Sequence, residues 1–175
     1  MAAVDEVGAV LRSLRGVWDE DAVDELDHAL QAAARAIDDG ADDELVLAAA
    51  LHDVGHSPLF GEVPAARHDR VARDWLTPRF GERVGWLAGA HVAAKRYLAA
   101  TDPDYANMLS DVSIDSLQHQ GGAGVDPTFV EHPWWPDALR LRHYDDAAKD
   151  PKGSCASIDD VLAVAQRVLL QRNWA

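Results

Sequence analysis

The side chains best suited to chemistry are histidines and aspartates spread over several segments of the chain. Six of them form the candidate set: His28, His52, Asp53, His68, His91 and Asp145. Four imidazoles with two carboxylates suit iron, manganese or another first-row metal, whereas structural zinc sites usually contain cysteine. Asp53 has two carboxylate oxygens, so it could bridge two cations. The composition of the set therefore predicts a metal centre.

His52 and Asp53 lie at the end of an apolar stretch, LVLAAALHDVGHSP, over residues 45–58. A helix of this composition is buried on most sides. An imidazole and a carboxylate are costly there unless they are paired or bind a metal. His56 shares a face with His52 for as long as the helix continues. An isolated His-Asp pair more often satisfies only itself, so the metal hypothesis depends on the other residues of the set.

Apolar residues recur at helical spacing through most of the chain. The predicted helices cover residues 3–16, 19–38, 42–55, 64–75, 81–99, 110–120, 136–149 and 157–173. No segment indicates a strand, and no internal repeat is present. We therefore predict an all-α helical bundle forming a single domain over residues 1–175. The metal core would lie within about 18–149, built from inward-facing side chains of facing helices, followed by a C-terminal helix at about 157–173.

Composition and charge exclude several classes of protein. A hydrophobic content of 48% with six tryptophans fits a globular protein. No apolar run reaches the roughly 18 residues of a membrane span, and the first residues lack the basic region of a signal peptide. The formal net charge of −14 argues against nucleic-acid and anionic-membrane partners, but not against a small anionic substrate held by local cations. The single cysteine, Cys155, suits a reducing cytoplasm, and the oligomeric state stays open.

The order H…HD…H…H…D resembles the HD-domain superfamily of metal-dependent phosphohydrolases. Two further stretches, HVAAKRYL at 91–98 and LSDVSIDSLQHQGG at 109–122, are followed by LRLRHYDDAAK at 139–149. Together they resemble the oxygenase branch of that superfamily, which includes 2-amino-1-hydroxyethylphosphonate dioxygenase and, more distantly, myo-inositol oxygenase. The resemblance runs from about Trp18 to Lys149. Its most specific piece is the lysine, Lys95, one turn after His91.

This resemblance implies a mixed-valent di-iron centre, Fe2+/Fe3+, with O2 as co-substrate. One iron would be held by His28, His52, Asp53 and Asp145. Asp53 would bridge to a second iron held by His68 and His91. A small α-hydroxyphosphonate would bind the second iron and lose its carbon–phosphorus bond, giving phosphate and a carboxylic acid.

Polar residues near the metal ligands are interpreted as the substrate pocket. Lys95 offers an ammonium one turn from His91, and Arg142 can present a planar fork to phosphonate oxygens. We predict His56 and Lys95 as catalytic, and the substrate-binding set as Trp18, Asp21, His56, Lys95, Ser113, Ser116, Gln120 and Arg142. Solvated surface charges remain the alternative for Lys95 and Arg142. The surface is expected for His119, His132 and His143.

Two positions depart from the phosphonate-cleaving pattern, which has a tyrosine and then a glutamate ahead of the first histidine. Trp18 and Asp21 stand there instead, and a helix over 19–38 would place both on the stripe that ends at His28. An indole has no oxygen to offer an open iron position, and aspartate is shorter than glutamate. Residues 123–125, Ala-Gly-Val, also replace an expected proline and methionine. We therefore predict a substrate other than 2-amino-1-hydroxyethylphosphonate.

Three other functions are compatible with the ligand set. An HD-type phosphohydrolase acting on a nucleotide or other small phosphate ester needs only metal-activated water. An oxygenase could act on a different substrate, such as a polyol. A non-catalytic HD module could sense a ligand.

Overall fold

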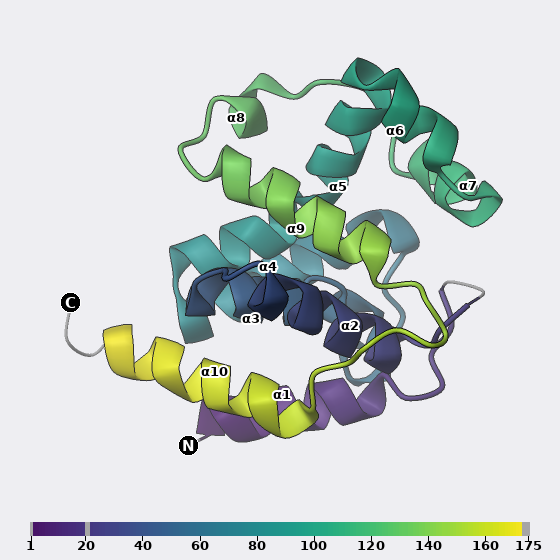
Figure 1. The fold of residues 1–175 in the computed structure, drawn as a ribbon. Helices are drawn as coiled ribbons and strands as arrows, with labels where there is room; N and C mark the ends of the chain where they lie inside the picture. The colour runs from purple at the N-terminus through teal and green to yellow at the C-terminus, as the bar shows by residue number, and fades with distance from the viewer. Residues whose placement is uncertain (1, 20–21, 173–175) are drawn as a thin grey trace.

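The computed structural model describes residues 2–19 and 22–172, and this part of the chain is helical without a strand (Figure 1). The helices are α1 (Ala2–Ser13), α2 (Glu25–Asp38), α3 (Asp43–Leu51), α4 (His68–Phe80), α5 (Glu82–Thr101), α6 (Pro103–Met108), α7 (Asp111–His119), α8 (Pro127–Val130), α9 (Trp135–Ala147) and α10 (Ile158–Arg172). Three short 3-10 turns, η1 (Val54–His56), η2 (Pro58–Phe60) and η3 (Ala65–Arg67), connect α3 to α4. The predicted all-α bundle is confirmed.

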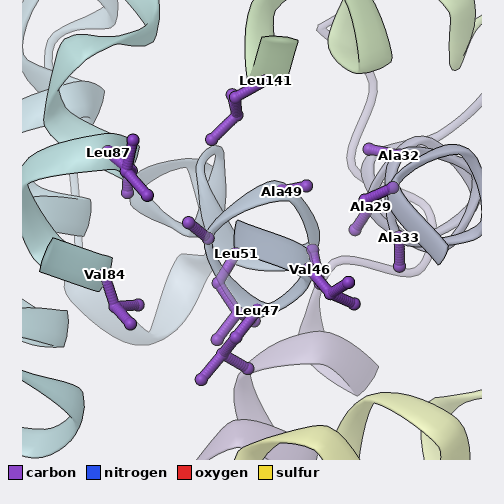
Figure 2. Packing of buried hydrophobic residues seen from close by; sticks show 14 of the residues in the cluster. Ala29, Ala32, Ala33, Val46, Leu47, Ala49, Leu51, Val84, Leu87 and Leu141 are labelled. Atoms are coloured by element: carbon purple, nitrogen blue, oxygen red, sulfur yellow. The ribbon is translucent and has the colours of Figure 1, made fainter. Parts of the chain in front are cut away.

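Helix α3 forms the centre of the bundle. Its residues from Leu45 to Leu51 are all buried, as their uniformly apolar character requires. Figure 2 shows α3 with side chains of α5 on one side, alanines of α2 on the other and Leu141 of α9 above. Helices α1 and α10 lie side by side on a further side, so the hydrophobic core extends from the first helix to the last (Figure 1). Because α3 is enclosed, the segment that follows Leu51 begins in the protein interior, with His52 buried.

The N-terminal end of α3 is fixed by polar contacts. The side chain of Asp42 accepts a hydrogen bond from the Leu45 N–H at 2.9 Å and caps the helix. Arg83 of α5 donates to Asp42 and Glu44 at 2.8 and 2.9 Å, and to Asp137 of α9 at 2.8 Å. One guanidinium thus joins three helices at the end of α3 opposite to His52 and Asp53.

Helix α2 begins later than predicted. Its N-cap is Asp24, whose carboxylate accepts from the backbone N–H groups of Gly16 and Asp27 at 2.8 and 3.0 Å. Arg15 adds two contacts to the same carboxylate, at 3.1 and 3.0 Å. With this cap the segment before Asp24 turns away from the helix axis. The predicted helical stripe from Trp18 to His28 is therefore wrong, and Asp21 lies outside the described residues.

Among the described residues, no helix is long and apolar enough to cross a membrane.

Gly55 in η1 allows a close approach between η1 and α4. A methyl group there would lie 2.7 Å from the Cα atom of His68, in overlap with backbone that has no room to move. We expect Gly55→Ala to lower the free energy of unfolding by about 1–3 kcal/mol, because overpacking forces the backbones apart. Gly8→Ala is the control, since the added methyl group there meets only the mobile end of Arg12. Equal urea midpoints for Gly55→Ala and wild type would contradict this reading of the contact.

Candidate metal centre

The six residues of the predicted metal set come together from five segments. His28 projects from α2, His91 from α5 and Asp145 from α9, while His68 is the first residue of α4. His52 and Asp53 directly follow α3. All four imidazoles and the Asp145 carboxylate are buried, and the Asp53 side chain is 16% exposed. The bundle therefore places four imidazoles and two carboxylates in one buried cluster.

One half of the cluster contains His28, His52, Asp53 and Asp145. The Nε2 atoms of His28 and His52 lie 3.3 Å apart. Asp53 Oδ2 is 3.4 Å from the first of these nitrogens and 3.1 Å from the second. The two carboxylate oxygens of Asp145 lie 3.4 and 3.3 Å from the same nitrogens. Ligand atoms of these four residues fall within 4.8 Å of one another, a grouping that could hold a metal ion.

The other half contains His68 and His91, whose Nε2 atoms lie 2.9 Å apart. The second oxygen of Asp53, Oδ1, is 3.2 Å from the His68 nitrogen and 3.3 Å from the His91 nitrogen. Asp53 thus presents one oxygen to each pair of imidazoles. His56 lies beside this half, with its ring stacked on that of His68 at a centroid distance of 4.5 Å.

Backbone carbonyls set the orientation of three imidazoles. Nδ1 of His28 lies 3.0 Å from the Ala148 oxygen, Nδ1 of His52 lies 2.8 Å from the Ala49 oxygen, and Nδ1 of His91 lies 2.6 Å from the Ala88 oxygen. A carbonyl oxygen only accepts, so each Nδ1 carries a proton and each Nε2 faces the cluster, where it offers a lone pair to a metal ion once any proton of its own has left. Asp53 Oδ1 is buried without a hydrogen-bond donor. Converging lone pairs and an unsatisfied carboxylate oxygen fit a bound cation.

Electrostatics show which charges the cluster carries without a metal ion. Burial opposes charge at His52, but the carboxylates of Asp53 and Asp145 outweigh it and raise the pKa of His52 to about 10. Burial likewise opposes ionisation of Asp53, yet the charge of His52 and hydrogen bonds from the imidazoles hold its pKa well below the usual range. The metal-free cluster therefore keeps ionised carboxylates and carries protons on imidazoles, which a metal ion must displace.

Arg142 lies beside Asp145 at the cavity wall, as its spacing predicts, and its guanidinium contacts carboxylates of the protein. It is 3% exposed, and its Nη1 lies 2.7 Å from Asp145 Oδ2. Its Nε donates to Asp146 at 2.9 Å and its Nη2 contacts the same carboxylate. The fork predicted to bind a phosphonate is thus used on the protein's own carboxylates, although the side chain still borders the cavity described next.

A narrow cavity of about 30 Å³ reaches the cluster. Its walls include Asp53, His68, His91, Lys95, Lys149, Ser116 and Gln120. Lys95 Nζ contacts Ser116 Oγ, and Lys149 Nζ donates to Ser113 Oγ at 3.3 Å. The Oε1 atom of Gln120 is buried and has no hydrogen-bond partner. A wider cavity of about 250 Å³ shares Asp19, His56, His68, Ser116 and Gln120 with the narrow one.

Of the remaining residues, some lie where the sequence predicts and others do not. Trp18 is 63% exposed and borders neither cavity, whereas its neighbour Asp19 borders both. His119 and His143 are exposed as predicted, but His132 is only partly exposed because its ring stacks on Trp86 at 4.1 Å.

Asp19, Glu25 and Lys149 are not among the predicted site residues. The sequence does place Lys149 on one helical face with Arg142 and Asp145, and Glu25 on the stripe that ends at His28. In the structure Lys149 borders the narrow cavity and Glu25 is buried. No pattern marks Asp19, because the chain at that point is not helical.

Two proteins of named activity are similar to the chain, although no family model matches it. Hydroxymethylphosphonate dioxygenase of Gimesia maris is 39% identical over 142 residues, covering 74% of this chain and 70% of the relative. The glycine-betaine-forming 1-hydroxy-2-(trimethylamino)ethyl phosphonate dioxygenase of Leisingera caerulea is 36% identical over 132 residues, covering 70% and 67%. The chain belongs to the phosphonate dioxygenase family. The predicted family and the predicted oxidoreductase class are confirmed.

Membership of the phosphonate dioxygenase family indicates what the buried cluster is for. A dioxygenase requires O2, and the His/Asp cluster supplies a place for the metal that activates it. The phosphohydrolase alternative is not favoured, because both named relatives are dioxygenases.

Glu25 makes the stability of this phosphonate dioxygenase depend on pH. Its side chain is 1% exposed with Oε2 unpaired, and burial together with the charge of Asp53 raises its pKa to about 8. The folded state therefore binds this proton more tightly than the unfolded state, and stability falls as pH rises from about 4.5 to about 8. Over this range the metal-free wild type should lose about 1–4 kcal/mol relative to Glu25→Gln in urea unfolding.

Glu131→Gln, at an exposed position, is the matched control. If Glu25→Gln and Glu131→Gln show the same pH profile as wild type, Glu25 does not take up this proton on folding.

Proposed function

We propose that the protein is a di-iron dioxygenase that cleaves the carbon–phosphorus bond of a small 1-hydroxyphosphonate. One oxygen atom of O2 enters each product, so that RCH(OH)PO3H2 and O2 give RCOOH and H3PO4. The observation that carries the proposal is the position of Asp53, with Oδ2 toward His28 and His52 and Oδ1 toward His68 and His91. A carboxylate shared in this way suits two adjacent cations, because it reduces their mutual repulsion.

The two halves of the cluster differ in their number of ligands. His28, His52, Asp53 and Asp145 would hold one iron, and Asp53, His68 and His91 would hold the other. The second site has fewer protein ligands and borders the narrow cavity, so substrate can reach its open positions. When bound, the iron pair, Fe2+/Fe3+, supplies the activation of O2 and the redox chemistry.

The chain's own cations bind and orient the phosphonate. Lys95 and Lys149 border the narrow cavity, and their contacts with Ser116 and Ser113 fix where the two ammonium groups lie. An ammonium in a partly dehydrated cavity attracts a phosphonate dianion strongly. Arg142 is assigned to holding Asp145 in place rather than to binding substrate.

Uncharged groups complete the pocket. Burial lowers the pKa of His56, so its imidazole is neutral and can accept a proton from a substrate group beside His68. The unpaired Oε1 of Gln120 can accept a hydrogen bond from a hydroxyl or an amine. We therefore keep His56 and Lys95 as the catalytic candidates, and Ser116 and Gln120 as substrate contacts. Ser113 borders a neighbouring cavity and would act through its contact with Lys149.

The substrate is proposed to be a small 1-hydroxyphosphonate other than 2-amino-1-hydroxyethylphosphonate. The helical stripe that supported this choice is wrong, and Trp18 is exposed. The support now comes from the named relatives, of which one acts on hydroxymethylphosphonate and the other on a trimethylamino compound. The narrow cavity of about 30 Å³ has the volume of about one water molecule, so the substrate would extend into the wider cavity that shares five residues with it.

A single HD-type domain over residues 1–175 and a cytoplasmic location belong to the same proposal. The continuous core from α1 to α10 supports one domain, and the unpaired Cys155 fits a reducing compartment.

Removal of the shared carboxylate tests the metal assignment. Wild type purified with iron under anaerobic conditions should hold two irons per chain. Asp53→Ala should lose both, whereas His68→Ala should lose mainly the second. His143→Ala, an exposed histidine, is the control. Elemental analysis with Mössbauer spectra measures the occupancy, and a single zinc ion that survives Asp53→Ala would exclude the di-iron proposal.

Turnover tests the chemistry and the role of Lys95. Wild type should release phosphate and consume O2 in equal amounts with hydroxymethylphosphonate or a related 1-hydroxyphosphonate. Lys95→Met should lower kcat/KM by about 10²–10³-fold, since it removes a charged contact in a buried site, while iron content stays normal. Lys152→Met, at an exposed lysine, should behave as wild type. Arg142→Met, in contrast, should lower iron occupancy through Asp145.

Phosphate release from phosphate esters without O2 consumption would contradict the dioxygenase proposal and favour a hydrolase. Full activity in Lys95→Met would leave the lysine without a role in substrate binding.

A further inference from the structure

A groove of about 390 Å³ lies beside the substrate cavities and contains three arginines. Arg70 and Arg73 come from α4, and Arg96 comes from α5. These are the same two helices that present His68 and His91 to the metal cluster, and Arg96 directly follows the buried Lys95. The groove and the metal cluster therefore share their supporting helices.

The charges of this arginine groove are unusual for the molecule. In a chain of net charge −14, most other arginines are neutralised by carboxylates, as Arg15 is by Asp24. Within the described residues, Arg70 and Arg96 have no such ion pair. Arg73 pairs only with the exposed Asp74 beside it. The guanidinium groups of Arg70 and Arg96 are therefore available to an anion, and an anion at Arg73 competes only with an exposed ion pair.

Two aspartates also border the arginine groove, but both accept hydrogen bonds from the backbone. Asp69 accepts from the Arg70 N–H at 2.8 Å, and Asp126 accepts from the Thr128 N–H and hydroxyl at 3.0 and 2.7 Å as the cap of α8. Among the residues that line the groove, three guanidinium groups stand against two carboxylates, an excess of one positive charge, while Asp74 lies outside the lining.

The position of Arg96 is set by the segment after α7. Its Nε donates to the Gly122 carbonyl at 2.8 Å, and the Gly124 N–H donates to the Arg96 carbonyl at 3.0 Å. A methyl group on Gly124 would lie 3.1 Å from Arg96 Nη2. Gly124 belongs to the segment 123–125 that departs from the expected pattern, and its lack of a side chain leaves room for the guanidinium.

Gln120 connects the arginine groove to the substrate cavities. It borders the groove, the wide cavity and the narrow cavity, and His119 borders the first two. An anion held by the arginines is thus one side chain away from the cavity of Lys95 and Lys149.

We propose that Arg70, Arg73 and Arg96 form a capture site where the phosphonate group of the substrate binds before it reaches the metal cluster. The inference rests on the proposed function, since it takes an anionic phosphonate as the substrate. The field of an acidic protein repels a dianion, and a local group of cations at the cavity mouth reverses this effect. Guanidinium groups suit the task because their planar forks match phosphonate oxygens.

The kinetic test compares two double variants of the iron-loaded enzyme with equal net charge. Arg70→Gln/Arg73→Gln removes charge from the groove, and Arg12→Gln/Lys152→Gln removes it from exposed positions on α1 and before α10. At low ionic strength the groove variant should lose about tenfold in kcat/KM with kcat unchanged, and the loss should shrink as salt screens the charges. An equal loss in the control, or a change confined to kcat, would overturn the proposal.

A binding test separates the groove from the catalytic assignment. Metal-free protein should broaden the 31P signal of inorganic phosphate, and Arg70→Gln/Arg73→Gln should do so less than wild type and the control variant. Equal broadening in all three would overturn the capture site. If no 1-hydroxyphosphonate is turned over, the proposed function fails while this measurement still decides whether the groove binds phosphorus oxyanions.

Discussion

The arrangement of the site depends on one buried carboxylate placed between two pairs of imidazoles. Asp53 follows a helix that is apolar on every side, so it cannot move toward solvent without unpacking α3. Its Oδ1 has no hydrogen-bond donor, and three of the neighbouring imidazoles have their Nδ1 protons engaged by backbone carbonyls. A group of acceptors that converge in a buried place is costly unless a cation joins them. The bundle thus keeps the cluster prepared for metal ions.

The cations around this cluster differ in what they contact. The guanidinium of Arg142 contacts Asp145 and Asp146, so it orients a carboxylate of the cluster. The ammonium groups of Lys95 and Lys149 contact the hydroxyl groups of Ser116 and Ser113 and border the narrow cavity. Arg83 joins three helices at the opposite end of α3.

Family membership and the geometry of the cluster answer different questions about this protein. The named relatives identify a phosphonate dioxygenase, and the geometry of Asp53 supports two metal sites with unequal numbers of protein ligands. The substrates named for the two relatives differ in the group attached to the hydroxyphosphonate. This difference implies that residues outside the cluster select the substrate tail. In this chain, Asp19 and Gln120 line the wider cavity, and Gln120 also borders the arginine groove.

The amino-acid sequence by itself determined the helical class and the buried α3, and it singled out the six residues of the predicted metal set that the structure brings together. These features can be recognised from short stretches of sequence. Apolar periodicity indicates which helix faces are buried, and a histidine or aspartate on a buried face usually needs an ion pair or a metal ion. Only the tertiary structure decided which carboxylate lies between the imidazole pairs, since distances between helices depend on packing. It also decided that Arg142 contacts Asp145, and that α2 begins at Glu25. The Asp24 cap and its contacts with Gly16 and Arg15 start the helix at Glu25, so it does not reach back to Trp18, because these capping hydrogen bonds outweigh a periodic pattern.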